Sequence, residues 1–190
     1  MKGAWVFVVG AVCGVAVMVL PRVATHLQMA LRGSHGPGIG DTRVHTEAKF
    51  AFTAKAPMEQ AWPLFGAEKE RVWSPNWNPQ FVHPMPANDE EGMVFTVAHD
   101  HMRSAWVSTQ FDEKNGRIQY VYMIPDALVT VITLQLTAER QETKVEVEYD
   151  RTALSPEADA HVKHLADGDR TSGPKWEKQV NEYLAKGGAR

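Results

Sequence analysis

Two histidines separated by one aspartate, His99-Asp100-His101, have the residue types and spacing that most directly suggest chemistry. Residues two apart on a β-strand point to the same side, so both imidazoles could reach one metal ion. A zinc site needs at least a third protein ligand, which His83, His161 or His164 would have to supply. The triplet falls where a predicted strand meets a turn, a position typical of solvated histidines. The sequence therefore predicts no metal site.

A second pair of histidines, His161 and His164, lies three residues apart in a predicted helix and therefore shares one helix face. That face could point into a cavity or outward. Lys163 and Asp167 flank the pair, which favours a position on the surface.

Carboxylates could act as general acids or bases if an apolar pocket shifted their pKa. Glu146, Glu148 and Asp150 alternate with apolar residues from Val145 to Tyr149, a pattern that places the acids on the solvent face of a half-buried strand. The sequence contains no Gly-x-Ser-x-Gly motif, phosphate-binding glycine loop or dinucleotide fingerprint. It therefore assigns no catalytic residue and no cofactor.

Aromatic residues are the remaining candidates, because ligand pockets are lined mainly by such side chains together with a few polar groups. The turn from Trp73 to Pro79 holds two indoles and two prolines between a short helical pattern and a run of strands, which makes its indoles the strongest candidates. Core packing would produce the same spacing at regular elements. The predicted cavity residues are Trp73, Trp77, Phe95, Trp106, Tyr120, Tyr122 and Trp176, and the two tyrosines could offer hydroxyls to a ligand.

These residues must be positioned by a sheet. Imperfect alternation predicts a first strand over residues 44–54, followed by a short helix opened by Pro57 and a helical turn at 67–72. Period-two patterns with hairpin-length links then predict an antiparallel meander. Its strands are expected at residues 93–99, 104–111, 117–124, 127–137 and 143–149, with a possible further piece at 81–83.

The C-terminal part reads as an amphipathic helix that begins near Ser155, with a break between Gly168 and Pro174. Its apolar stripe includes Leu165 and Trp176. A curved antiparallel sheet packed on such a helix is an α+β layer arrangement. A cavity stays open between the two if the helix does not fill the curve of the sheet.

Composition argues against nucleic-acid binding and against a disulfide framework. The 190-residue chain has a formal net charge of −3 and a pI near 6.2, so it lacks the basic character typical of nucleic-acid binding. Its single cysteine, Cys13, cannot form a disulfide framework within one chain. Cysteine usage therefore does not define the redox compartment.

Residues Gly3–Leu20 contain no charged side chain, and their length is at the lower limit for crossing a bilayer core about 30 Å thick. A cleaved signal peptide and a buried helix are the alternatives, but residues near Ala24 and Ala30 form poor cleavage sites. The sequence predicts a single-pass membrane protein with the membrane side undetermined. We expect an anchor and interfacial stretch at 1–31, a glycine-rich linker at 32–41 and a ligand-binding domain at 42–186.

The order of elements over residues 42–186 resembles the helix-grip fold of the START-like (SRPBCC) superfamily, the polyketide cyclase/dehydrase and lipid transport group. The similarity is carried by Ala56–Phe65 after the first strand, by the Trp73–Pro79 turn, by Gly92–Phe95 opening a strand, and by a C-terminal helix containing Trp176 and Tyr183-Leu184. The resemblance implies binding of lipids, sterols, hormones or polyketides. Only some members are enzymes, and no catalytic residue carries over. The membrane segment departs from the typical soluble member.

The expected function is therefore that of a membrane-anchored domain that binds a hydrophobic small molecule or lipid in a cavity between the sheet and the C-terminal helix. One alternative is a cyclase- or dehydratase-type enzyme that uses an inward His or Tyr. The other is a non-catalytic interaction domain with a closed cavity. An inward titratable residue in an open pocket would favour the enzyme, and a dry apolar pocket would favour the binding protein.

Overall fold

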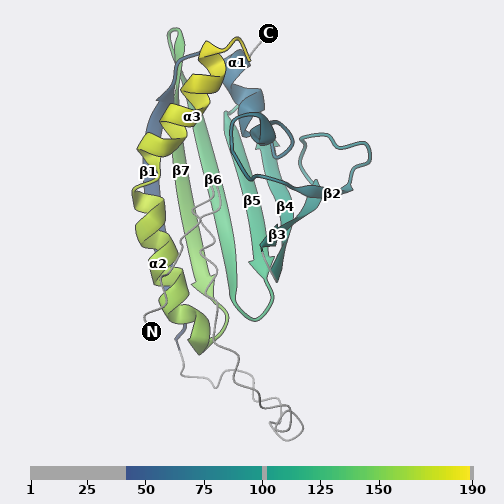
Figure 1. Cartoon of the computed structure of the whole chain (residues 1–190), viewed down its shortest axis with the longest axis vertical. Coiled ribbons are helices and arrows are strands. Elements are labelled where there is room, and N and C mark those ends of the chain that lie inside the picture. Colours follow the sequence, from purple (N-terminus) through teal and green to yellow (C-terminus); the bar gives the residue numbers. More distant parts are fainter. Residues whose placement is uncertain (1–41, 100–101, 189–190) are drawn as a thin grey trace, which may run out of the picture.

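The computed structural model describes residues 42–99 and 102–188, which form one curved antiparallel sheet and a set of helices on its inner face (Figure 1). The strand order is β1-β7-β6-β5-β4-β3-β2. The predicted meander and the predicted first strand are confirmed. The strands are β1 (His45–Ala54), β2 (Gln80–His83), β3 (Val94–His99), β4 (Met102–Asp112), β5 (Arg117–Ile124), β6 (Leu128–Glu139) and β7 (Glu142–Ala153).

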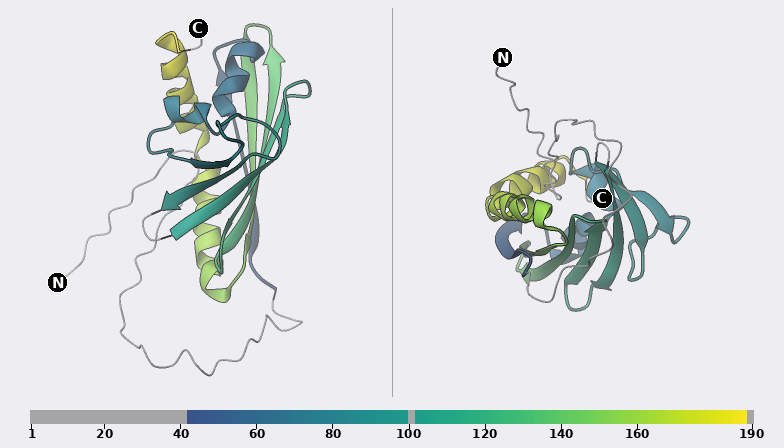
Figure 2. Two further views of the ribbon diagram at one scale, coloured as in Figure 1. Left: turned by 90° about the vertical axis from the view of Figure 1, so that its right-hand side faces the viewer. Right: turned by 90° about the horizontal axis from the view of Figure 1, so that it is seen from below.

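Side chains alternate between the two faces of the sheet, because successive residues of a strand point in opposite directions. In β6, Ile132 and Leu134 are buried on the inner face, whereas Val131 is only partly covered. A register shift between Ser108 and Gln110 interrupts the β4–β5 ladder, and irregularities of this kind bend a strand and increase its twist. The strands consequently form an arc around the helices (Figure 2).

The C-terminal region forms two helices, α2 (Asp159–Arg170) and α3 (Gly173–Ala185), after the short 3-10 helix η3 (Pro156–Ala158). The predicted long helix is thus divided at the predicted break. Pro174 stands in the first turn of α3, where its missing N–H is not needed. At Gly173 a Cβ atom would lie 3.1 Å from the backbone oxygen of Ala51, so the glycine allows α3 to begin close against β1.

Three short helices follow β1: α1 (Met58–Ala61), η1 (Trp62–Phe65) and η2 (Lys69–Val72). Together with residues 73–79 they form a segment, here called the 57–79 segment, that covers part of the inner face beside α3 (Figure 1). The Asp89 carboxylate accepts a hydrogen bond from the Glu68 backbone N–H at 3.0 Å and lies against Gly66. A Cβ at Gly66 would fall 2.1 Å from that carboxylate. The glycine therefore allows residues 84–92 to approach the segment.

The two edge strands of the sheet are built differently. β2 has four residues, contains a register shift between Phe81 and His83, and is followed by Pro84. β1 is ten residues long, but helix side chains bond to its free edge. Arg170 Nη2 donates to the Glu47 oxygen at 3.0 Å, and Asn181 Nδ2 donates to the Thr53 oxygen at 2.9 Å.

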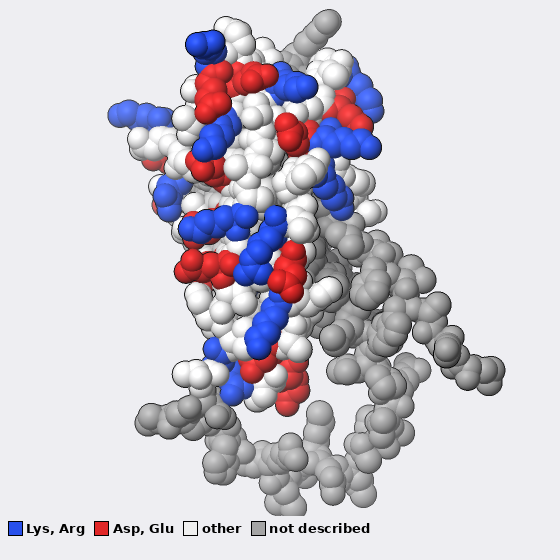
Figure 3. Space-filling model, turned by 90° about the vertical axis from the view of Figure 1, so that its left-hand side faces the viewer, with Lys and Arg blue, Asp and Glu red and all other residues white. Residues whose placement is uncertain are grey.

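On the side of the molecule that carries α2 and α3, Lys and Arg lie interspersed with Asp and Glu (Figure 3). The surface pair of Arg170 with Asp167 and that of Lys178 with Glu182 are examples. The acids of β7 face outward as predicted, with Glu148 paired to Lys49 at 2.9 Å. Mixed charge of this kind gives this face no strong field of one sign.

The predicted anchor at 1–31 and linker at 32–41 lie outside the described residues. None of the helices in the described part of the chain is long and apolar enough to cross a membrane.

Candidate functional site

Three of the predicted aromatic residues form a stack across neighbouring strands of the inner face. Phe95 on β3 stacks on Trp106 of β4 with ring centroids 5.4 Å apart, and Trp106 stacks on Tyr122 of β5 at 4.2 Å. The strand register produces this stack, because Phe95 pairs with Trp106 and Trp106 pairs with Tyr122. The Trp106 indole N–H donates to Ser104 Oγ at 2.7 Å, which fixes the orientation of the ring.

Both indoles of the Trp73–Pro79 turn are buried, with Trp73 only 6% and Trp77 only 8% exposed. The Trp73 N–H donates to the Leu64 oxygen at 2.6 Å, and the Trp77 N–H donates to the Ala67 oxygen at 2.7 Å. Both hydrogen bonds therefore connect the turn to earlier residues of the same 57–79 segment.

The ring contacts of these two indoles point in different directions. The Trp73 ring lies 5.4 Å from Trp176 of α3, and the Trp77 ring lies 5.5 Å from Trp106 of β4. The turn thus contacts both α3 and the inner face of the sheet at β4, with its indoles directed into the interior.

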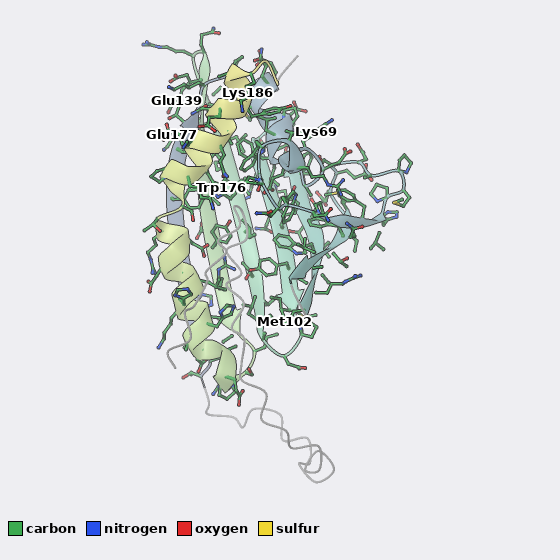
Figure 4. All side chains as sticks on the ribbon, in the orientation of Figure 1. Lys69, Met102, Glu139, Trp176, Glu177 and Lys186 are labelled. Atoms are coloured by element: carbon green, nitrogen blue, oxygen red, sulfur yellow. The ribbon has the colours of Figure 1, made fainter. Side chains whose placement is uncertain are left out.

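A small cavity of about 10 Å³ lies inside the fold, between the sheet, α3 and the 57–79 segment. This is roughly the space that one water molecule occupies. Figure 4 shows Trp176, one of its lining residues, on α3. Nine side chains from the sheet and the helices line the cavity: Phe65, Glu70, Trp77, Phe95, Trp106, Tyr120, Ile132, Leu134 and Trp176.

Five of the seven predicted cavity residues are in that lining. Trp73 and Tyr122 are not, although both are buried close to it. Trp73 packs behind the cavity against Phe65 and Trp176, and Tyr122 lies beyond Trp106 in the aromatic stack. A role of all seven in binding a ligand stays a prediction.

Glu70 is the one acidic residue in the cavity lining, and it is only 4% exposed. Ser74 hydrogen-bonds to its carboxyl group, while Oε1 has no hydrogen-bond partner among the described residues. Burial, together with the nearby Asp89 carboxylate, raises the pKa of Glu70 well above its ordinary value. Such a group holds its proton at pH values where an exposed glutamate is ionised.

Tyr120 is the second titratable group of the lining. Its hydroxyl donates to the Phe65 oxygen at 3.1 Å. Burial, with Asp89 and Glu70 nearby, raises the pKa of Tyr120 well above 10. The phenol is therefore a protonated donor already used by the backbone of the 57–79 segment, and it is poorly suited to act as a base.

A second polar cluster is built around Arg151 on β7, which is fully buried. Its guanidinium makes two hydrogen bonds to the Asp169 carboxylate of α2, from Nε at 2.9 Å and from Nη2 at 3.1 Å. Nη1 also donates to the Tyr122 hydroxyl and, at 3.1 Å, to Thr130 Oγ1. The guanidinium carbon lies 4.6 Å from the centre of the Tyr149 ring. This cluster connects α2 to the sheet, and its paired polar groups fill the interior between α2 and strands β5 to β7.

The His99-Asp100-His101 motif lies largely outside the described part of the chain. Among the residues that the structure describes, no three His, Cys, Asp or Glu side chains gather in a group that could hold a metal ion. On α2, His164 is exposed, as predicted, and His161 is half-buried. Burial, with His164 nearby, lowers the pKa of His161.

Sequence reasoning missed the polar groups of the interior, Glu70, Arg151 and Asp169. Arg151 continues the inward register of Val147 and Tyr149 by one more step, so extending that alternation would have placed it inside. Asp169 lies four residues after Leu165, on the buried side of α2. Glu70 gives no comparable signal, because its one-turn 3-10 helix is too short to show a period.

Comparisons with known proteins support the fold. Norcoclaurine synthase from Thalictrum flavum aligns over 84% of this chain and 98% of its own, with a TM-score of 0.59 and 11% identity. XoxI from Bacillus cereus aligns over 75% and 98%, with a TM-score of 0.54 and 19% identity. Ara h 8.0201 aligns over 75% and 99%, with a TM-score of 0.51 and 15% identity. No protein-family model and no curated protein matches the sequence. The chain thus shares the helix-grip fold of these solved structures, which confirms the fold that the resemblance predicted.

Proposed function

We propose that this domain binds a hydrophobic small molecule or lipid in its interior, between the sheet and α3. The observation that carries the proposal is a cavity inside the grip whose lining is aromatic and aliphatic except for one carboxyl group. Apolar surface removed from water would supply the affinity, at about 25 cal/mol per Å². The polar group would set the orientation of the ligand.

Binding requires the cavity to grow, because sites for drug-sized ligands enclose about 300–1,000 Å³. The 57–79 segment is the element suited to move. Its helices have one turn each, and the two indole hydrogen bonds, to Leu64 and Ala67, remain within the segment. An outward shift of the segment would therefore separate Trp73 from Trp176 and Trp77 from Trp106 without breaking either of those bonds. It would break the hydrogen bond from the Tyr120 hydroxyl to the Phe65 oxygen.

A matched pair of substitutions tests the site. Ile132 lines the cavity, whereas its neighbour Val131 lies on the outer face of the sheet. In the full-length chain, saturable binding of the apolar probe 4-ethyltoluene is measured by quenching of tryptophan fluorescence. Ile132→Phe should weaken binding by about tenfold or more at an overpacking cost of about 1–3 kcal/mol, and Val131→Phe should leave binding unchanged. Equal effects of the two substitutions would place the probe elsewhere.

The same experiment separates this proposal from the hypothesis of an interaction domain with a permanently closed interior. A closed interior predicts no saturable binding of the probe to the unmodified chain. The remaining alternative, a cyclase- or dehydratase-type enzyme, would need an inward His or Tyr free to exchange protons. The Tyr120 hydroxyl is bonded to the Phe65 oxygen of the 57–79 segment, so it would become free to exchange protons only if that segment moved.

We further propose that residues 3–20 anchor the chain in a membrane as a single pass, so that the domain stays close to a lipidic source of ligand. The uncharged run and its length support this. Deleting residues 1–40 should move the protein from the membrane fraction to the soluble fraction with its far-UV circular dichroism retained. A deletion variant that stays in the membrane fraction would count against the anchor.

Native mass spectrometry of the full-length chain from its own cells would identify the molecule that accompanies it.

A further inference from the structure

The fold uses only part of the Glu70 carboxyl for its own structure. Its side chain projects from η2 into the cavity, where Trp77, Phe95 and Leu134 offer no hydrogen-bonding group to it. Ser74 engages the carboxyl, yet Oε1 stays without a partner among the described residues although the residue is almost fully buried. A buried polar atom left unpaired is costly and calls for a partner.

The neighbouring polar groups are engaged elsewhere in the structure and are not partners of Oε1. The Tyr120 hydroxyl donates to the Phe65 oxygen, and the Asp89 carboxylate accepts the Glu68 N–H and is itself an acid. Asp89 raises the pKa of Glu70, so the two carboxyls repel each other when charged. Oε1 therefore has no partner among the described protein groups, and the cavity that Glu70 lines is where a water or an incoming polar group could pair with it.

We propose that Glu70 Oε1 recognises a hydroxyl group on an otherwise apolar ligand. This inference rests on the proposed function, because it requires that the interior accept a ligand. A neutral carboxyl presents Oε1 either as a donor or as an acceptor, and a hydroxyl can fill both roles. An anionic group would meet the negative charge of Asp89, and a second polar group on the ligand would find only aromatic and aliphatic lining around it.

Two probes of equal size test the proposal: 4-ethylphenol, and 4-ethyltoluene, in which a methyl group replaces the hydroxyl. Dissociation constants are measured on the full-length chain by quenching of tryptophan fluorescence, and the ratio of the two constants is compared between variants. That comparison cancels the different solubilities of the probes. Glu70→Leu should reduce the preference for 4-ethylphenol by about tenfold, since it removes one buried hydrogen bond. Glu70→Gln should keep most of the preference, because its amide still donates and accepts.

A spectroscopic measurement keeps the test independent of how well Glu70→Leu folds. In the unmodified chain, the infrared C=O stretch of a protonated carboxyl should shift with 4-ethylphenol and not with 4-ethyltoluene, and the shifted band should be missing in Glu70→Gln.

The outcomes separate the two proposals. If both probes bind and Glu70→Leu leaves their ratio unchanged, the role of Glu70 is refuted while ligand binding stands. If neither probe binds the unmodified chain, the proposed function fails and this inference fails with it.

Discussion

Replacing Asp169 with asparagine should destabilise this protein more than its small change in shape suggests. The Arg151 and Asp169 side chains are only 1% and 5% exposed, and two hydrogen bonds of 2.9 Å and 3.1 Å join them. Asparagine keeps the volume of the aspartate but not its charge. The guanidinium would then stay buried beside Tyr122 and Tyr149 with no counter-ion from α2.

The expected cost is about 3–5 kcal/mol, the usual result of removing one partner of a buried pair. This is a large part of the roughly 5–15 kcal/mol that stabilises a typical domain. At about 2–4 °C per kcal/mol for a chain of this size, the Tm should fall by about 6–20 °C. In contrast, Arg151→Met with Asp169→Leu removes both charges and should lie within about 2 kcal/mol of the unmodified protein, so it should be more stable than Asp169→Asn alone.

Urea and thermal unfolding followed by circular dichroism would measure these differences. Glu182→Gln is the control, because it breaks an exposed pair with Lys178 at 3.8 Å and should change stability by less than about 0.5 kcal/mol. If Asp169→Asn costs no more than this control, the pair does not hold α2 to the sheet. If the double substitution Arg151→Met with Asp169→Leu costs as much as the sum of Arg151→Met alone and Asp169→Leu alone, the penalty does not come from an unpaired charge.

Three further predictions follow from the interior and the turns. Glu70, whose pKa is raised by burial and by Asp89, binds more protons when folded than when unfolded, so stability should fall as pH rises from about 4.5 through the raised pKa. Glu70→Gln should flatten that decline between pH 5 and pH 8 in Tm measurements, and an unchanged slope would show that Glu70 titrates normally. Trp73→Ala should lower the free energy of unfolding in urea by about 3–5 kcal/mol. Trp73→Phe should lower it by about 1–3 kcal/mol, because only the indole hydrogen bond is lost. An alanine variant as stable as the unmodified chain would mean that the indole is not part of the core. Gly116→Ala should destabilise the protein by more than about 1 kcal/mol, because the φ of Gly116 is +65° and a Cβ there would lie 2.2 Å from a backbone oxygen. Gly168 lies in α2 with open space around it, so Gly168→Ala should stabilise the protein by about 0.5–1 kcal/mol. Equal Tm shifts for the two glycine variants would contradict that distinction.

The sheet could be predicted because its strands are half-buried, and a half-buried strand records its two faces as a period of two. The end of β7 shows the limit of this signal. The predicted strand stopped at Tyr149, but β7 continues to Ala153, with Arg151 at the next inward position. The prediction ended early because a charged residue at an inward position breaks the apolar alternation. Its charge is compensated by Asp169, on another element, and no local pattern contains that information.

The site was less predictable for a related reason. Phe95 and Trp106 have the same spacing whether they fill a core or line a pocket, so the sequence could not reveal that the cavity is as small as one water. Glu70 was overlooked because its burial depends on Tyr120 and on residues near Asp89, which are distant along the chain. The membrane anchor at residues 3–20 stays a prediction.

The two edges of the sheet have a consequence for how this protein behaves at high concentration. Exposed strand edges are templates on which other chains can add strands and aggregate. Here β2 is short and irregular, and the helices occupy backbone oxygens of β1 through Arg170 and Asn181. Removing those two side chains, without touching the interior, should expose the Glu47 and Thr53 oxygens of β1 and favour edge-to-edge assembly of the protein.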